Sequence, residues 1–334
     1  MFIHPSRLLF FILLILGTLS AVSASSWFSI WVGLEINLLA FLPLIFVYSS
    51  TTSEAMLKYF LTQALASVCL FMILVLTASL KPIIFEITSS NFLFMVLMLK
   101  LGAAPFHMWF PEVSDGLAWI PNLILMTWQK IAPLVVSMQL STPGNFLLVV
   151  IMSSLFFGGV GGFNQVSLRK ILAYSSVSHL GWLLAASTLG LQLTLIYFSF
   201  YIMLSTILIF WFSFFNFWFL HQIFSYHYSF KIYKHMLMMN LLSLGGLPPF
   251  LGFLPKWVVL VHLNFNQFYL LSLLMVILSL IPLYFYLRVT YSALVLTHMH
   301  PSWCVKPLAA PPYLIFLSAI SILGLPLAPL ILFL

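Results

Sequence analysis

Long apolar runs separated by short polar interruptions fill almost the whole chain. Each run approaches the roughly 20 residues that an α-helix needs to cross the hydrocarbon core of a bilayer. The pattern predicts eleven membrane-spanning helices, near residues 8–25, 27–48, 56–79, 84–105, 116–139, 145–163, 169–187, 191–218, 236–262, 267–296 and 311–333. The connections are short except at 219–235 and 297–310. We therefore predict an all-α polytopic membrane protein that forms a single membrane domain over residues 1–334.

Composition supports this class and excludes others. Of the 334 residues, 63% are hydrophobic and only 5% are charged, whereas about a quarter of a soluble domain is charged. Eleven spans leave no room for a soluble domain that would hold a nucleotide or an iron–sulfur cluster. The two cysteines, Cys69 and Cys304, form no CxxC motif and are too few for a cluster. We expect no cofactor in this chain.

The basic residues indicate the orientation of the chain in the membrane. Lysine and arginine gather on the side from which helices insert. The N-terminus and the even-numbered connections share one side, which holds Arg7, Lys58, Arg169, Lys170, Lys231, Lys234 and Lys306, and the opposite side holds Lys81. The asymmetry supports the helix count and places the N-terminus on the insertion side. These charges are scattered, so we expect no nucleic-acid partner. Residues 1–26 resemble a signal peptide, but we expect them to be retained as the first span.

Four ionisable residues stand out away from the predicted helix ends and loops: Glu35, Lys100, Lys130 and Lys256. One reading is snorkelling, in which a lysine stem lies in lipid and its ammonium reaches the interface. A charge at the bilayer centre costs roughly 2.5–3.5 kcal/mol, so four cost on the order of 10 kcal/mol, comparable with the stability of a whole domain. This cost favours a functional buried array.

The chemistry of such an array suits proton transfer. Removal from water lowers the pKa of a lysine, and a nearby carboxylate opposes the shift by stabilising the ammonium. Glu35 with Lys100 is therefore a candidate switch between holding and releasing a proton, and Lys130 and Lys256 are candidate further stations. His179, in "LAYSSVSHLGW", is a candidate relay because it titrates near neutrality. A packing or hydrogen-bonding role for a lone histidine remains the alternative.

A faint internal repeat relates the two halves. Residues 101–111, "LGAAPFHMWFP", resemble residues 244–255, "LGGLPPFLGFLP". The second segment comes five predicted helices after the first, and an odd offset inverts the topology. This arrangement is typical of transporter folds with inverted repeats and broken helices. We predict a five-helix repeat at 8–139, its inverted copy at 145–296, and an extra C-terminal helix at 311–333.

The charged motifs resemble those of the antiporter-like membrane subunits of respiratory complex I, and in particular its mitochondrial members. The matching segments span most of the chain in the family's order: "GLEINLLAFLPL" (33–44), "EAMLKYFLTQALAS" (54–67), "KLGAAPFHMWFPEV" (100–113), "WQKIAPL" (128–134), "NQVSLRKILAYSSVSHLGW" (164–182) and "GGLPPFLGFLPKW" (245–257). Animal mitochondrial members lack three of the fourteen helices of bacterial ones, which agrees with eleven spans and with an N-terminus on the matrix side.

The resemblance implies a role for each residue. Glu35 matches the family's essential glutamate, Lys100 and Lys256 match the lysines of the two broken helices, Lys130 matches the central lysine, and His179 falls in the serine-rich histidine motif. It also implies proton translocation across the mitochondrial inner membrane, driven by electron transfer to ubiquinone in other subunits. NADH, FMN, iron–sulfur clusters and ubiquinone would bind to those subunits. Implied partners are the other membrane-arm subunits and membrane lipids such as cardiolipin.

Two other functions would use the same residues. A self-contained cation/proton antiporter needs the same lysine and glutamate array. A structural membrane subunit could hold charges that merely pair inside an assembly. The sequence alone leaves both alternatives open.

Overall fold

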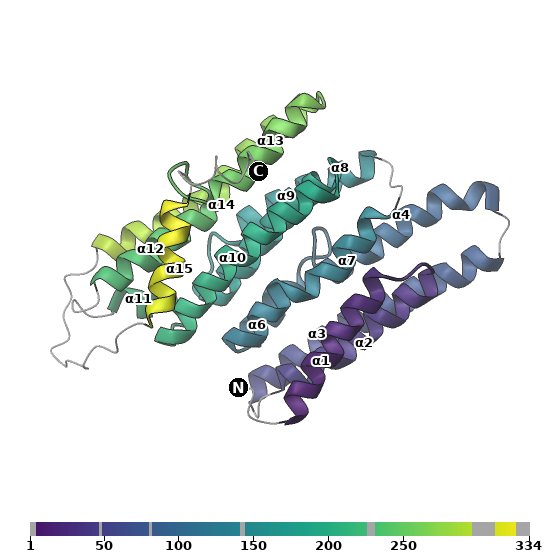
Figure 1. Cartoon of the computed structure of the whole chain (residues 1–334), viewed down its shortest axis with the longest axis horizontal. Coiled ribbons are helices and arrows are strands. Elements are labelled where there is room, and N and C mark those ends of the chain that lie inside the picture. The colour runs from purple at the N-terminus through teal and green to yellow at the C-terminus, as the bar shows by residue number, and fades with distance from the viewer. Residues whose placement is uncertain are drawn as a thin grey trace. The chain divides into compact units, whose positions relative to one another are not determined.

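The computed structural model describes residues 5–46, 49–79, 82–140, 144–225, 231–295 and 311–324 (Figure 1). Within these ranges all regular elements are α-helices, and the one β-type pairing is an isolated bridge between Ser167 and Phe219. The all-α prediction is confirmed. The chain divides into two compact units, Met1–Ser154 and Leu155–Leu334.

The first unit contains α1 to α7 and the start of α8. Their bounds are α1 Pro5–Val22, α2 Trp27–Ile45, α3 Ser50–Ser79, α4 Pro82–Leu101, α5 Trp109–Gly116, α6 Trp119–Met126, α7 Trp128–Met138 and α8 Gly144–Gly161. Helix α3 packs against α2, α4 and α5, and α7 packs against α1, α2 and α4. These contacts place α2, α3, α4 and α7 around one interior.

The second unit begins within α8 and is built mainly from α9 to α15. The bounds are α9 Leu168–Ser187, α10 Leu191–Phe215, α11 Leu220–Ser225, α12 Lys231–Gly245, α13 Phe253–Phe265, α14 Tyr269–Val295 and α15 Pro312–Leu323. Helix α10 packs against α9, α12, α13 and α15, so it lies at the centre of this unit.

Both segments of the predicted repeat interrupt a helix in the same way. At the end of α4, the N–H groups of Gly102 and Ala103 donate to the carbonyls of Leu99 and Met98. At the end of α12, Gly246 and Leu247 likewise donate to Ser243 and Leu242. Both sets are the bonds of a Schellman motif, and φ is +71° at Gly102 and +80° at Gly246. A left-handed residue at a helix end costs least when it is glycine. Inversion of one repeat relative to the other stays a prediction.

Some boundaries differ from those predicted. The span at 116–139 is not one helix, because it breaks at Thr127 between α6 and α7, where the Thr127 hydroxyl donates to the Leu123 carbonyl at 2.7 Å. Lys130 therefore lies at the start of α7 rather than in mid-helix. Residues 109–116 form a separate helix, α5, and the connection 219–235 contains α11. Lys81, Lys306 and residues 325–333 of the last predicted span lie outside the described residues.

Several helices have the size of membrane spans. In the described ranges, five are long and apolar enough to cross a bilayer by length and composition: Pro5–Val22, Trp27–Ile45, Ser50–Thr77, Leu191–Phe215 and Tyr269–Leu294. A shorter apolar helix, Phe253–Phe265, adjoins the helix break after α12. The break after α12 thus separates two helices, α12 with 15 residues and α13 with 13, that are each shorter than the roughly 20 residues of a span.

Candidate functional site

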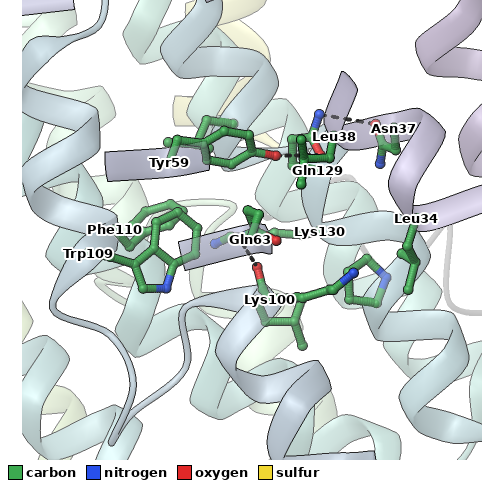
Figure 2. A pocket seen from close by; sticks show the side chains of 13 residues that line it. Leu34, Asn37, Leu38, Tyr59, Gln63, Lys100, Trp109, Phe110, Gln129 and Lys130 are labelled. Atoms are coloured by element: carbon green, nitrogen blue, oxygen red, sulfur yellow. Dashed lines mark hydrogen bonds between the residues drawn. The ribbon is translucent and has the colours of Figure 1, made fainter. Parts of the chain in front are cut away.

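A small polar cavity lies inside the first unit, between α2, α3, α4 and α7 (Figure 2). Its volume of about 20 Å³ gives room for about one water molecule. Two of the predicted site lysines, Lys100 and Lys130, line it. The other polar lining residues are Asn37, Tyr59, Gln63, Trp109 and Gln129. Such a lining can hold an ordered water that exchanges hydrogen bonds with an ammonium group.

Lys100 reaches the cavity because α4 ends one residue after it. Its side chain is only 7% exposed, and it extends toward Leu34 of α2 (Figure 2). Its backbone carbonyl is one of those left without a helical partner by the break, and it accepts a hydrogen bond from Gln63 Nε2 at 3.3 Å. Trp109 Nε1 donates to the neighbouring Leu99 carbonyl at 3.1 Å. Side chains of α3 and α5 therefore satisfy the polar end of the helix that carries Lys100.

Glu35 lies beside this site without pairing directly with Lys100. It is half-buried on α2, next to Leu34, and its charge acts on Lys100. Among the described residues, no Glu35 oxygen lies within the 4.0 Å of a direct ion pair with Lys100 Nζ. The predicted switch between Glu35 and Lys100 stays a prediction, since the two groups form no direct ion pair in this conformation. A short shift of either side chain would change how strongly the carboxylate holds the ammonium.

Lys130 is the more deeply buried of the two lysines. Its side chain is 1% exposed, and its Nζ lies 5.2 Å from the centre of the Phe110 ring. A cation over an aromatic face is attracted by the ring quadrupole. The break at Thr127 places Lys130 in the first turn of α7, where it reaches the same cavity as Lys100. The structure therefore brings these two lysines together.

A chain of neutral polar groups beside the lysines was not predicted from the sequence. Gln129 Nε2 donates to Asn37 Oδ1 at 3.1 Å, and the Tyr59 hydroxyl donates to Gln129 Oε1 at 3.4 Å (Figure 2). Two features of the sequence could have indicated these residues. Tyr59 and Gln63 are one helical turn apart on α3, and Gln129 directly precedes Lys130. These bonds connect α2, α3 and α7 around the cavity.

Lys256, in the second unit, is held without a carboxylate. All five acidic residues of the chain precede residue 116, so this unit contains no acid. Lys256 Nζ donates to the Gly245 carbonyl at 2.8 Å and lies 5.9 Å from the centre of the Trp182 ring. Gly245 is the last residue of α12, where carbonyls and the helix dipole present negative charge. The helix break therefore supplies the partner of this lysine.

His179 lies close to that lysine site. It is 6% exposed on α9, and its Nδ1 is 2.9 Å from the Tyr197 hydroxyl of α10. The rings of His179 and Tyr201 are 5.2 Å apart. The Trp182 ring, which lies under Lys256, stacks with Tyr197 at 6.5 Å and 6°. Aromatic contacts thus connect His179 and Lys256, the two predicted site residues of the second unit.

Metal binding has little support in the described part of the chain. Within those ranges, no group of three or more histidine, cysteine, aspartate or glutamate side chains is placed to hold a metal ion. Cys69 is a free, exposed thiol on α3.

Comparison with known proteins places the chain in a family. Residues 24–282 match the family model described as NADH:quinone oxidoreductase/Mrp antiporter, transmembrane. The chain is 47% identical to NADH-ubiquinone oxidoreductase chain 2 of Anopheles gambiae over 307 residues, covering 90% of this chain and 89% of that one. It is 42% identical to the protein of the same name from Locusta migratoria, and the match covers 97% of this chain and 96% of that one.

Solved structures share the fold at lower identity. A chain of respiratory complex I from Thermus thermophilus matches with a TM-score of 0.83 and 22% identity, over 98% of this chain and 79% of that one. A chain of the membrane-bound sulfane sulfur reductase, an archaeal respiratory membrane complex, matches with a TM-score of 0.82 and 14% identity, over 96% and 72%. The fold is thus that of an antiporter-like membrane subunit. The chain belongs to the NADH:quinone oxidoreductase/Mrp antiporter transmembrane family, among its members called NADH-ubiquinone oxidoreductase chain 2.

Proposed function

We propose that the chain is a proton-translocating core membrane subunit of NADH:ubiquinone oxidoreductase in the mitochondrial inner membrane. Glu35, Lys100, Lys130, His179 and Lys256 form its proton relay. Quinone reduction in other subunits, which hold NADH, FMN, iron–sulfur clusters and ubiquinone, drives the transfer. The observation that carries the proposal is the burial of three lysines beside helix breaks, each 8% exposed or less. The chain's partners are then the neighbouring membrane-arm subunits and lipids such as cardiolipin.

The local partners of the lysines fit a proton carrier better than a static ion pair. A buried charge that only serves structure is usually paired closely with an opposite charge. Lys100 instead interacts with a Glu35 carboxylate that is outside pairing distance, and Lys256 is held by a carbonyl and a ring. These partners stabilise an ammonium less than a contacting carboxylate does. A small rearrangement can therefore change whether each lysine keeps its proton.

Proton movement within the first unit would follow the polar cavity. Lys100 and Lys130 both line a space large enough for one water molecule. In this proposal, a water there accepts a proton from one ammonium and donates one to the other amine. Glu35 biases the first step, because approach of its carboxylate favours the charged form of Lys100.

The relay can be tested with Lys100→Ala in the assembled complex. We expect quinone reduction and complex assembly to persist while protons pumped per electron fall at least severalfold, because the variant removes the proton-carrying amine. Proton uptake and NADH oxidation would be measured together in proteoliposomes. Lys58→Ala is the matched control, since Lys58 is 51% exposed and pairs with Glu112 at 2.7 Å on the surface. Full coupling in an assembled Lys100→Ala complex would refute the relay role and favour a structural one.

The antiporter alternative has its own test. A self-contained exchanger would be recovered in mild detergent as a lone oligomer with cation/proton exchange activity. We expect the chain to copurify with other subunits and to lack exchange activity when separated from them.

A further inference from the structure

The hydrogen-bond partner of His179 is a neutral group. The identity of this partner matters because His179 is proposed to take up and release protons. Protons reach and leave a histidine relay only if its ring stays correctly oriented both as the neutral imidazole and as the cation. The second hydrogen bond of a histidine sets which nitrogen carries the proton. In the second unit this bond joins Nδ1 to the Tyr197 hydroxyl at 2.9 Å.

A tyrosine hydroxyl suits both states because it can donate or accept. It donates to Nδ1 when the imidazole is neutral and Nδ1 is unprotonated. When both nitrogens carry protons, rotation of the hydroxyl lets Tyr197 accept from Nδ1–H. A carboxylate partner would favour the cation, and no acidic residue occurs after position 115. A backbone carbonyl could only accept. Tyr197 can therefore hold the ring in either state while adding no charge.

Packing connects Tyr197 to the lysine as well. Its side chain is 1% exposed, and its ring stacks with Trp182, the ring that lies under Lys256 Nζ. His179 and Trp182 are three residues apart on α9, so both face α10. One α10 side chain thus contacts the histidine through its hydroxyl and the lysine's aromatic neighbour through its ring.

We propose that Tyr197 is a positioning residue that keeps His179 able to exchange protons and keeps it aligned with the Lys256 site. The inference rests on the proposed relay function. The other titratable groups near this site are Tyr201 of α10, whose ring contacts His179, Lys256 of α13, which lies over the Trp182 ring, and Tyr286 of α14, which lies near Tyr201. The Tyr201 hydroxyl bonds with Ser176, whereas the Tyr197 hydroxyl bonds with His179. Tyr201 can therefore serve as the control for Tyr197.

The test uses Tyr197→Phe, which keeps the ring and removes the hydroxyl, and Tyr201→Phe as the matched control one turn away. In assembled complex reconstituted into liposomes, we expect Tyr197→Phe to lower protons pumped per electron, because His179 then lacks the hydroxyl that orients its ring in both protonation states. Its pH profile of proton pumping should also shift, because the partner of a titrating ring is lost. Tyr201→Phe should change neither quantity.

Comparison with His179→Ala separates the two proposals. If His179→Ala reduces pumping and Tyr197→Phe leaves both the ratio and the pH profile unchanged, the positioning role of Tyr197 is wrong and the relay stands. If His179→Ala itself leaves pumping unchanged, His179 is not part of the relay. We expect Tyr197→Phe to add nothing in the His179→Ala background, because it acts through that ring. An additional loss there would contradict the inference.

Discussion

At the residue scale, the helix breaks determine where the buried lysines meet their partners. A carbonyl at a helix end has no partner within the helix. In the first unit Gln63 satisfies such a carbonyl, and in the second unit the Lys256 ammonium does so directly. A carbonyl at a helix end therefore binds the Lys256 ammonium directly. In the first unit the carbonyl belongs to Lys100 itself and is bound by Gln63.

Gly246 gives a direct test of this role. A Cβ added to Gly246 would lie 2.8 Å from Lys256 Nζ, and the φ of +80° disfavours any side chain. We expect Gly246→Ala to displace Lys256 from the Gly245 carbonyl, lowering protons pumped per electron severalfold, and to cost about 1–2 kcal/mol through backbone strain. Gly190→Ala is the control, because φ is +142° there and nothing lies within 4 Å of the added Cβ. Equal proton pumping by the two variants would contradict steric displacement of Lys256.

The sequence identified the charged residues of the candidate site better than the neutral ones. A lysine within an apolar run is conspicuous because its burial is costly. Gln63, Gln129 and Asn37 carry no charge and are tolerated in membrane helices wherever they find a partner. The contact between His179 and Tyr197 joins two helices, so no local pattern could have revealed it.

At the element scale, close contact between α1 and α2 fixes the helix that carries Glu35. A Cβ on Gly33 would lie 2.7 Å from the Ala21 nitrogen, and one on Gly17 would lie 2.9 Å from the Asn37 nitrogen. Each helix thus presents a glycine to the backbone of the other, as small residues do at membrane helix interfaces. Asn37, which bonds with Gln129, is part of this contact.

Enlarging Gly33 should separate the two helices. We expect Gly33→Val to destabilise the subunit by about 1–3 kcal/mol, the usual cost of overpacking, and to lower the temperature at which the purified complex loses this subunit. Val32→Leu is the neighbouring control, since Val32 is exposed on the same helix. Unchanged thermal stability of Gly33→Val would contradict the close packing.

The presence of helices was predictable from the apolar runs, whereas the break at Thr127 was not. The breaks after α4 and α12 follow glycine and proline signals in the sequence. The break at Thr127 has neither residue at that point, and it depends on a hydroxyl that bonds to the backbone one turn earlier. Such bonds compete with helical ones but leave no clear signal in the sequence.

At the scale of the whole molecule, the distribution of lysine and arginine predicts a matrix-side N-terminus. Helix α3 offers a test because its 30 residues extend about 45 Å, enough to cross a bilayer. With Cys69 and Cys304 replaced by serine, a membrane-impermeant maleimide should label Ser79→Cys in intact mitoplasts. We expect Ser53→Cys, near the other end of α3, to react only after permeabilisation. The opposite pattern of labelling would reverse the predicted orientation.

The central claim is that protons cross the membrane through the buried lysines of this chain. The most direct measurement is the number of protons pumped per electron by the assembled complex carrying Lys130→Met, which removes the most buried of these ammonium groups while keeping an apolar side chain of similar length. The account predicts that quinone reduction continues and that this ratio falls. An assembled Lys130→Met complex that pumps as many protons per electron as the unaltered one would contradict it.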